Sequence, residues 1–271
     1  MRQASGGVRV GRSIRRGFVA ASVLLAVSIG TTNAFALDYP SSVLATPNLV
    51  GYWRFESDTG ANSTVNGYTG TYLGNAAIGT ATSGPALAGV SGNSALVLDG
   101  NGDGVTTNLA AQDQFPTAGT IVAWVYLNQQ PSTDVDHNVF QIAARASSGD
   151  DFDFQINPDD HLYLFSDSGG SASSPAALPL HRWVMVAGSF DTAAATRKVY
   201  IDGRVVGSNT PGLHTPNSAT FTIGYSAVWA NRWLDGAIDE VAIFDRALSD
   251  SEIADLQVAA GDLIFRSYFT Y

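Results

Sequence analysis

The sequence has no cysteine, few charged residues and only two methionines. Its 271 residues comprise 14% charged side chains, 45% hydrophobic residues, 10% aromatics and 28 glycines. The absence of cysteine excludes a disulfide-stapled scaffold and any cysteine-based zinc site. The low charge and the high apolar content exclude a disordered chain. The abundance of glycine and aromatic residues favours a β-rich fold with many turns, in one large domain or at most two small ones.

Basic residues are also scarce, and five of the 14 precede the first acidic residue. An uncharged and mostly apolar run, Phe18 to Ile29, follows these five. It is too short to cross about 30 Å of hydrocarbon as a helix. Ala34-Phe35-Ala36 then supplies the small residues that signal peptidase prefers. We therefore predict a signal peptide over residues 1–36, cut after Ala36, and export to the periplasm, the cell surface or the exterior. Arg15 and Arg16 leave the twin-arginine route open.

The exported chain is strongly acidic. Without its leader it keeps nine basic side chains against 24 acidic ones, a net charge near −15. Such a surface repels phosphate backbones and anionic lipid, so neither nucleic acid nor a membrane is an expected partner. Calcium is an expected cofactor, because exported proteins meet it at high concentration and weak oxygen-ligand sites then fill.

The pattern beyond the leader is that of one all-β domain. Residues 37–48 are expected to form an irregular lead-in, residues 49–260 the domain and residues 261–271 an aromatic-rich tail. A single short helix is predicted at the end of the domain, capped by Ser249 with Glu252 and stopped by Gly261. Asp202-Gly203 predicts a tight hairpin. The clearest strands are Leu49–Phe55, Ala95–Leu98, Thr120–Leu127, Asn138–Ala144, Phe152–Asn157, Leu162–Ser166, Trp183–Phe190, Lys198–Ile201, Thr220–Ile223 and Ala237–Phe244.

Six blocks of the sequence follow one another in a familiar order. They are residues 49–55, 95–100, 120–125, 181–191, 199–203 and 236–249, the last opening as Gly236-Ala237-Ile238-Asp239-Glu240-Val241. This ordered set resembles the laminin G-like family of concanavalin A-like jelly rolls. The resemblance implies an antiparallel two-sheet jelly-roll sandwich with one short C-terminal helix. Because the superfamily includes lectins, glycanases and adhesion modules, the resemblance predicts the fold more sharply than the function.

The segment Asp99-Gly100-Asn101-Gly102-Asp103-Gly104 has the alternating oxygens of a calcium loop. Ala110 stands where an EF-hand needs a glutamate, which excludes that motif. In laminin G-like jelly rolls a calcium ion often lies at the sandwich edge. The resemblance implies Asp99, the backbone oxygen of Gly100 and Asp239 as its ligands, with Asp103 as an added candidate. The alternative is that these aspartates only cap turns.

Aromatic and hydrogen-bonding residues gather in one predicted loop, which contains Tyr225, Trp229, Asn231, Arg232 and Trp233. Sugar binding needs flat apolar rings beside polar groups, because pyranose faces are apolar and their edges are polar. The resemblance places this loop at the rim of the concave sheet, and we interpret it as a sugar site with a ring stacked on one of the two tryptophans. The alternative is that the tryptophans cover the core edge.

Asp153, Gln155 and Tyr163 fall on the polar side of two predicted strands. They are candidates to line the polar face of the concave sheet. The alternative is a solvated sheet face without a ligand.

Motifs for catalysis are missing. The sequence has three glutamates, Glu56, Glu240 and Glu252, and no two have the spacing of a glycosidase pair. It has no nucleophile elbow and no H-x-x-x-H zinc pair. We therefore expect a secreted, non-catalytic, lectin-like module with a structural calcium, whose partner is a polysaccharide or surface glycan. A structural or adhesive module that binds another envelope protein, and a polysaccharide hydrolase or lyase on the same fold, remain as alternatives.

Overall fold

The structure is a computed structural model that describes residues 37–57, 61, 63–79, 84–110, 117–145, 152–166, 170–212 and 219–261. The predicted signal peptide and residues 262–271 of the tail lie outside the described residues. No helix in the described part of the chain is long and apolar enough to cross a membrane.

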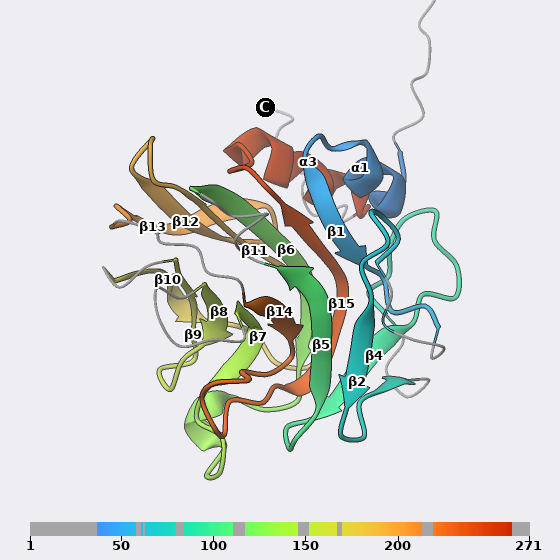
Figure 1. The fold of residues 1–271 in the computed structure, drawn as a ribbon, viewed down its shortest axis with the longest axis vertical. Coiled ribbons are helices and arrows are strands. Elements are labelled where there is room, and N and C mark those ends of the chain that lie inside the picture. The colour runs from blue at the N-terminus through green and yellow to red at the C-terminus, as the bar shows by residue number, and fades with distance from the viewer. Residues whose placement is uncertain are drawn as a thin grey trace, which may run out of the picture. The chain divides into compact units, whose positions relative to one another are not determined.

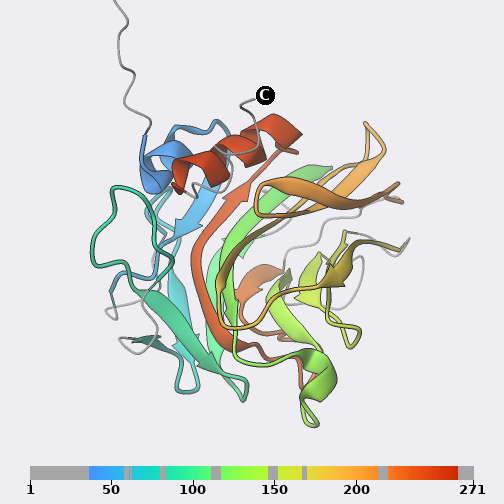
Figure 2. The ribbon, with the colours of Figure 1, turned by 180° about the vertical axis from the view of Figure 1, so that it is seen from behind.

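Two antiparallel sheets form the domain, as predicted (Figures 1 and 2). Sheet A has the strand order β13-β12-β11-β6-β15-β4-β3, with β1 also paired to β15. Its strands are β1 (Leu49–Trp53), β3 (Ala77–Gly79), β4 (Ala95–Asp99), β6 (Ala118–Leu127), β11 (Trp183–Asp191), β12 (Thr196–Ile201), β13 (Arg204–Asn209) and β15 (Asp235–Phe244).

Sheet B has the order β10-β9-β8-β7-β14-β5-β2. A short 3-10 helix, η1 (Pro131–Thr133), follows β6. The strands of sheet B are β2 (Gly70–Leu73), β5 (Gly104–Ala110), β7 (Phe140–Arg145), β8 (Asp153–Ile156), β9 (His161–Phe165), β10 (Ser171–Ala177) and β14 (Thr220–Ile223).

The main core lies between the two sheets. Alternate residues of each strand point into it, so that Ile121 and Ile238 of sheet A belong to the same buried cluster as Phe154 and Phe221 of sheet B. A second buried cluster lies between the other face of sheet A and two helices, and it contains Trp124. Burial on both faces explains why β6, β11 and β15 are apolar along most of their length.

Helix α3 (Asp250–Ala259) confirms the predicted capping box. The Ser249 side chain accepts a hydrogen bond from the Glu252 amide at 3.2 Å, and the Glu252 carboxylate accepts one from the Ser249 amide at 2.8 Å. The Asp202-Gly203 hairpin between β12 and β13 is also confirmed, with positive φ at both residues. These local motifs act over three or four residues, which is why they can be read from sequence.

The lead-in is not irregular, because it contains a second helix, α1 (Tyr39–Ala45). Asp38 caps it by accepting a hydrogen bond from the Ser41 amide at 2.8 Å, and Pro40 fits its first turn. A helix this short depends on packing. Its Tyr39 ring meets the Trp124 ring edge-on, with centroids 5.9 Å apart. This long-range contact is invisible in the local sequence pattern.

Candidate functional site

The connection from β14 to β15 is a closed, hairpin-like loop. The Ser226 amide donates to the Arg232 carbonyl at 3.1 Å, and the Leu234 amide donates to the Gly224 carbonyl at 3.0 Å. The Tyr225 and Trp233 rings stack with centroids 5.2 Å apart and planes 7° apart. The structure therefore brings the predicted aromatic residues of this loop together.

The tip of the loop presents one tryptophan to solvent. Trp229 is 46% exposed, and its backbone amide donates to the Ser226 hydroxyl at 3.1 Å. The Arg232 guanidinium lies over the Trp229 ring, 5.2 Å from its centroid. Asn231 is exposed beside them, with a positive φ of 63°. Trp229, Asn231, Arg232 and the half-exposed Trp233 are thus the predicted loop residues that a ligand can reach.

Tyr225 does not lie where a residue that contacts a bound sugar is expected. It is buried beneath the half-exposed Trp233, and its hydroxyl shares a 2.6 Å hydrogen bond with the Thr106 hydroxyl. Burial raises the pKa of Tyr225 above its usual value. We conclude that Tyr225 supports the loop from below.

Arg232 also joins the loop to sheet B. Its Nη1 donates a hydrogen bond to Oε1 of Gln155 on β8 at 3.1 Å. Gln155 pairs across the sheet with Tyr163 of β9, whose ring stacks on Phe165 with centroids 5.8 Å apart. The Tyr163 hydroxyl donates to Asp159 at 2.7 Å, and this bond is the main reason why the pKa of Tyr163 is raised. The two groups predicted from sequence are therefore linked by the Arg232–Gln155 hydrogen bond.

Asp153 and Gln155 do not form an open, solvated face. They are only 8% and 3% exposed, and neighbouring Gln141 of β7 is fully buried. Gln141 Nε2 donates to Asp153 Oδ1 at 3.2 Å, while its Oε1 is buried with no hydrogen-bond partner. Gln141 was not among the predicted site residues. The alternation of Phe140 and Ile142 around it was the available signal that it shares the polar face.

The predicted calcium ligands fall in two places. Asp99, Gly100 and Asp103 share the turn after β4, where Asp103 Oδ2 accepts from the Asp99 amide at 3.0 Å. Asp99 accepts from the Asn101 amide at 2.9 Å and from the Asn75 side chain at 2.9 Å. The Asn75 bond is the largest influence lowering the pKa of Asp99, whereas burial raises that of Asp103. These contacts are those of turn-capping carboxylates.

Asp239 lies away from that turn, because strand register separates them. Asp99 of β4 stands opposite Asp235 of β15, and Asp239 is four residues further along β15. At about 3.3 Å per residue this is roughly 13 Å, which is too far for one ion. Among the described residues, no three histidine, aspartate or glutamate side chains are grouped as a metal site.

Asp239 itself has surroundings that fit a cation. It is fully buried, and burial raises its pKa well above the usual range. Its Oδ2 accepts from Asn93 Nδ2 at 2.8 Å, and the same Nδ2 donates to the Pro85 carbonyl at 3.1 Å, while Asn93 Oδ1 is buried without a partner. Asp239 Oδ1 accepts from the Glu240 amide at 2.8 Å. A half-turn of the Asn93 amide would place its Oδ1 where Nδ2 now contacts Asp239 and the Pro85 carbonyl. Glu56 accepts from the adjacent Ser94 amide at 3.1 Å. Oxygen donors of this kind suit calcium.

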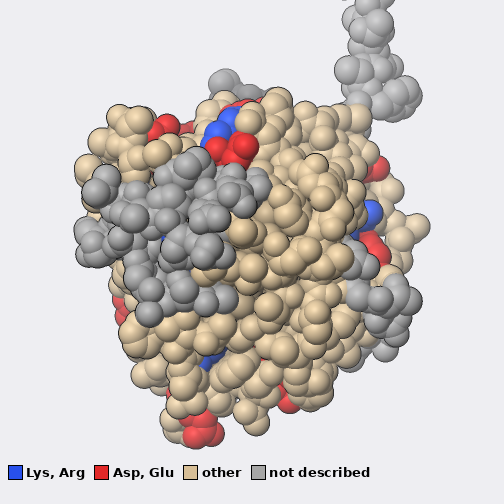
Figure 3. Space-filling model, viewed as in Figure 1, with Lys and Arg blue, Asp and Glu red and all other residues tan. Residues whose placement is uncertain are grey.

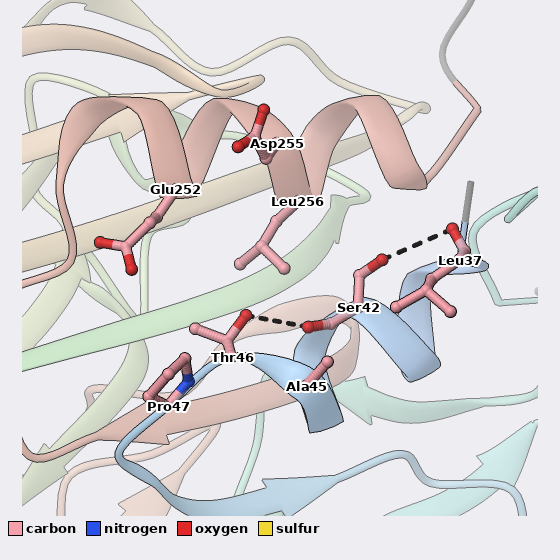
Figure 4. A pocket seen from close by; sticks show the side chains of 8 residues that line it. All are labelled: Leu37, Ser42, Ala45, Thr46, Pro47, Glu252, Asp255 and Leu256. Carbon is pink, nitrogen blue, oxygen red and sulfur yellow. Dashed lines mark hydrogen bonds between the residues drawn. The ribbon is translucent and has the colours of Figure 1, made fainter. Parts of the chain in front are cut away.

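A separate hollow of about 240 Å³ lies between the two helices (Figure 4). Its wall combines apolar Leu37, Pro47 and Leu256 with the carboxylates of Glu252 and Asp255. Leu37, Leu44 and Val258 are exposed apolar side chains of this helical region. The hollow is on the helix-covered side of sheet A, away from the aromatic loop.

Comparisons with known proteins agree with the fold. Domain 4 of an extracellular GH43 arabinanase from Geobacillus stearothermophilus, in complex with arabinotriose, is 23% identical with a TM-score of 0.57 over 78% of this chain and 98% of that one. Trypanosoma rangeli sialidase is 17% identical with a TM-score of 0.58, over 80% of this chain and 33% of that one. The receptor-binding domain of botulinum neurotoxin D is 14% identical with a TM-score of 0.59, over 80% and 53%.

At these identities the solved structures show a shared fold. No curated protein matches the chain. A family model of the concanavalin A-like lectin/glucanases superfamily matches residues 99–254, which is more than half of the 271 residues. The resemblance stated from sequence is thereby confirmed, and the chain belongs to the concanavalin A-like lectin/glucanase superfamily.

Proposed function

We propose that this protein is an exported, non-catalytic module that binds a polysaccharide or surface glycan through the β14–β15 loop. The observation that carries the proposal is the exposed Trp229 ring, with the Arg232 guanidinium against it and bonded to Gln155 of the sheet. An apolar sugar face packs on such a ring while hydroxyls bond the polar groups at its edge. The arabinotriose complex of the arabinanase domain supports a carbohydrate ligand.

Two features support weak, reversible binding. The loop tip presents the half-exposed Trp229 and the exposed Asn231 to solvent, so we expect a small contact area. Arg232 and Asn231 supply hydrogen-bond donors without enclosing a ligand. For a shallow site of this kind we expect a Kd of about 10 µM to 1 mM, or about 4–7 kcal/mol of binding free energy.

The positions of the carboxylates support a non-catalytic role. Near the loop, Asp153 bonds Gln141 and Asp159 bonds Tyr163. Burial raises the pKa of Glu240 to about 8, a value that would suit a general acid. Glu240 is nevertheless fully buried in sheet A, bonded by Tyr52 and Arg54, where no polysaccharide can reach it.

A structural calcium ion is part of the proposal. Asp239, Asn93 and Glu56, with the Pro85 carbonyl, are the residues that fit it best. The ion would neutralise the buried Asp239 carboxylate and tie β15 to the segment before β4. The ion would raise the stability of the fold and would not contact the glycan, since this cluster is not part of the loop.

The test is a glycan screen followed by calorimetric titration of each hit. We expect Trp229→Ala to weaken binding about tenfold or more and Trp229→Phe to retain most of it. Val258→Ala is a matched control, because Val258 of α3 is 47% exposed and Trp229 is 46% exposed. Absence of any glycan ligand, or unchanged binding by Trp229→Ala, would contradict the proposal. Product release from any polysaccharide in the panel would contradict the non-catalytic assignment.

The second candidate function is binding of another envelope protein through the helical region. Leu37 lines the hollow between α1 and α3, and the exposed Leu44 and Val258 lie on these two helices, which favours it. The two functions separate experimentally, because Trp229→Ala affects the first and Val258→Asp the second.

A further inference from the structure

We infer that the loop site selects a sugar that carries a carboxylate, such as a uronate, and that Arg232 is the residue that recognises it. This inference rests on the proposed function and specifies the class of glycan. It goes beyond hydroxyl recognition, because a carboxylate and a guanidinium interact through charge as well as through two parallel hydrogen bonds.

Arg232 is a cation whose described contacts contain no counter-ion. Its side chain bonds a neutral amide oxygen, that of Gln155, and stacks on the neutral Trp229 ring. Among the described residues, no carboxylate oxygen lies within 4.0 Å of the guanidinium nitrogens of Arg232. Four other described cations do have such a partner: Arg54 with Glu56 and Glu240, Arg182 with Asp202, Lys198 with Asp250, and Arg246 with Glu252.

That difference is informative in an acidic protein. The chain has 24 acidic residues against 14 basic ones, so a carboxylate partner is available to most surface cations. Charged side chains are sparse on the face seen in Figure 3. Asp153, two residues before Gln155 on β8, is 8% exposed, and its Oδ1 accepts a hydrogen bond from Gln141. Arg232 is therefore left free to pair with a charge that the ligand brings.

The guanidinium is also held in a fixed orientation. Gln155, which fixes one nitrogen, is itself held by a 2.5 Å bond from its Nε2 to Asn157 Oδ1. The Trp229 ring, which contacts the guanidinium, restricts its rotation further. A guanidinium has five N–H donors and this network uses one, so donors remain for a bidentate carboxylate. A sugar ring on the face of Trp229 that Arg232 does not cover would reach these donors with a carboxylate that extends past the edge of the indole.

The experiment compares oligogalacturonate trimers with the same trimers after carboxyl reduction, which gives a neutral sugar of the same shape. We expect the wild-type protein to bind the uronate form about tenfold or more tightly than the reduced form. Arg232→Gln should abolish that preference while retaining the weaker binding of the neutral sugar. Arg232→Lys should keep only part of the preference, since it keeps the charge without the planar fork.

Two controls keep the test decisive. Gln155→Leu removes the bond that orients Arg232 but leaves its charge, so binding should weaken while uronate remains preferred. Thermal unfolding of each variant verifies the fold. Equal binding of the charged and reduced trimers by wild type, or an equal loss of both in Arg232→Gln, would overturn the inference. In those outcomes a Trp229-dependent affinity for neutral sugar would still support the proposed function, whereas loss of all glycan binding would remove both.

Discussion

The side chain of Arg232 donates a hydrogen bond to Gln155, 77 residues earlier in the chain, across 3.1 Å. This bond attaches an exposed loop to a buried row of polar residues on β7 and β8. It connects two groups of residues that look independent in the sequence. Its consequences can be measured without knowing the ligand.

The first prediction concerns the order of the loop. Gln155→Leu removes the acceptor of the Arg232 side chain, so the loop should open more often and trypsin should cleave after Arg232 several times faster. Mass spectrometry of timed digests gives the rate. Cleavage after Arg182, whose side chain is 51% exposed and bonded to Asp202, is the internal control. An unchanged ratio of the two cleavage rates would show that the bond does not order the loop.

The second prediction concerns calcium. Adding millimolar calcium to chelator-treated protein should raise the melting temperature by several degrees, because a ligand that binds the folded state stabilises it. Asp239→Asn should abolish this shift, since Asp239 is the buried carboxylate beside Asn93. Asp99→Asn should retain it, since the oxygens of Asp99 are engaged by amides of its own turn and by Asn75. A shift lost in Asp99→Asn and kept in Asp239→Asn would place the ion in the turn after β4.

The third prediction concerns the cap of α3. Ser249→Ala removes the side-chain acceptor of the Glu252 amide, so the free energy of unfolding should fall by about 1 kcal/mol. Urea titration with a constant m-value measures it. Ser208→Ala on β13, an exposed serine outside any helix, should change stability by less than about 0.5 kcal/mol. Equal stability of the two variants would refute the assigned role of the cap.

The fourth prediction concerns pH. Hydrogen bonds from Arg246 at 2.9 and 2.6 Å lower the pKa of Glu252 from 4.5 to about 2 in the folded chain. Because the folded value is below the unfolded one, ionised Glu252 stabilises the fold above about pH 4.5, and this contribution is lost as the pH falls toward 2. Glu252→Gln should therefore be less stable than wild type at neutral pH, and the two should converge in acid. Parallel stability curves from pH 7 to about 2.5 would contradict this.

The parts of the fold that were predictable are those with short-range signals. The Ser249 capping box, the Asp202-Gly203 hairpin and the alternating strands each depend on neighbours a few residues apart. The placement of Asp239 was not predictable in this way. Its distance from Asp99 follows from the register of β4 on β15, and this register is set by packing across the whole sheet.

The candidate site shows the same division. The aromatic loop was visible because its residues are close in sequence. The burial of Gln155 and the role of Gln141 were not visible, because they depend on strands β7 and β8 and on the reach of Arg232 from the loop. Helix α1 was not predicted for a related reason, since its Tyr39 packs against the distant Trp124.

The pairing of β1 with β15 has an architectural consequence. Strand β1 follows α1 and strand β15 precedes α3, so both ends of the described domain come together at the helical corner (Figures 1 and 2). The β14–β15 connection lies at the opposite end of the sandwich in both views. A domain with adjoining ends can be spliced into a host polypeptide without forcing the flanking parts of the host apart. In such an insertion the β14–β15 loop would point away from the junction with the host.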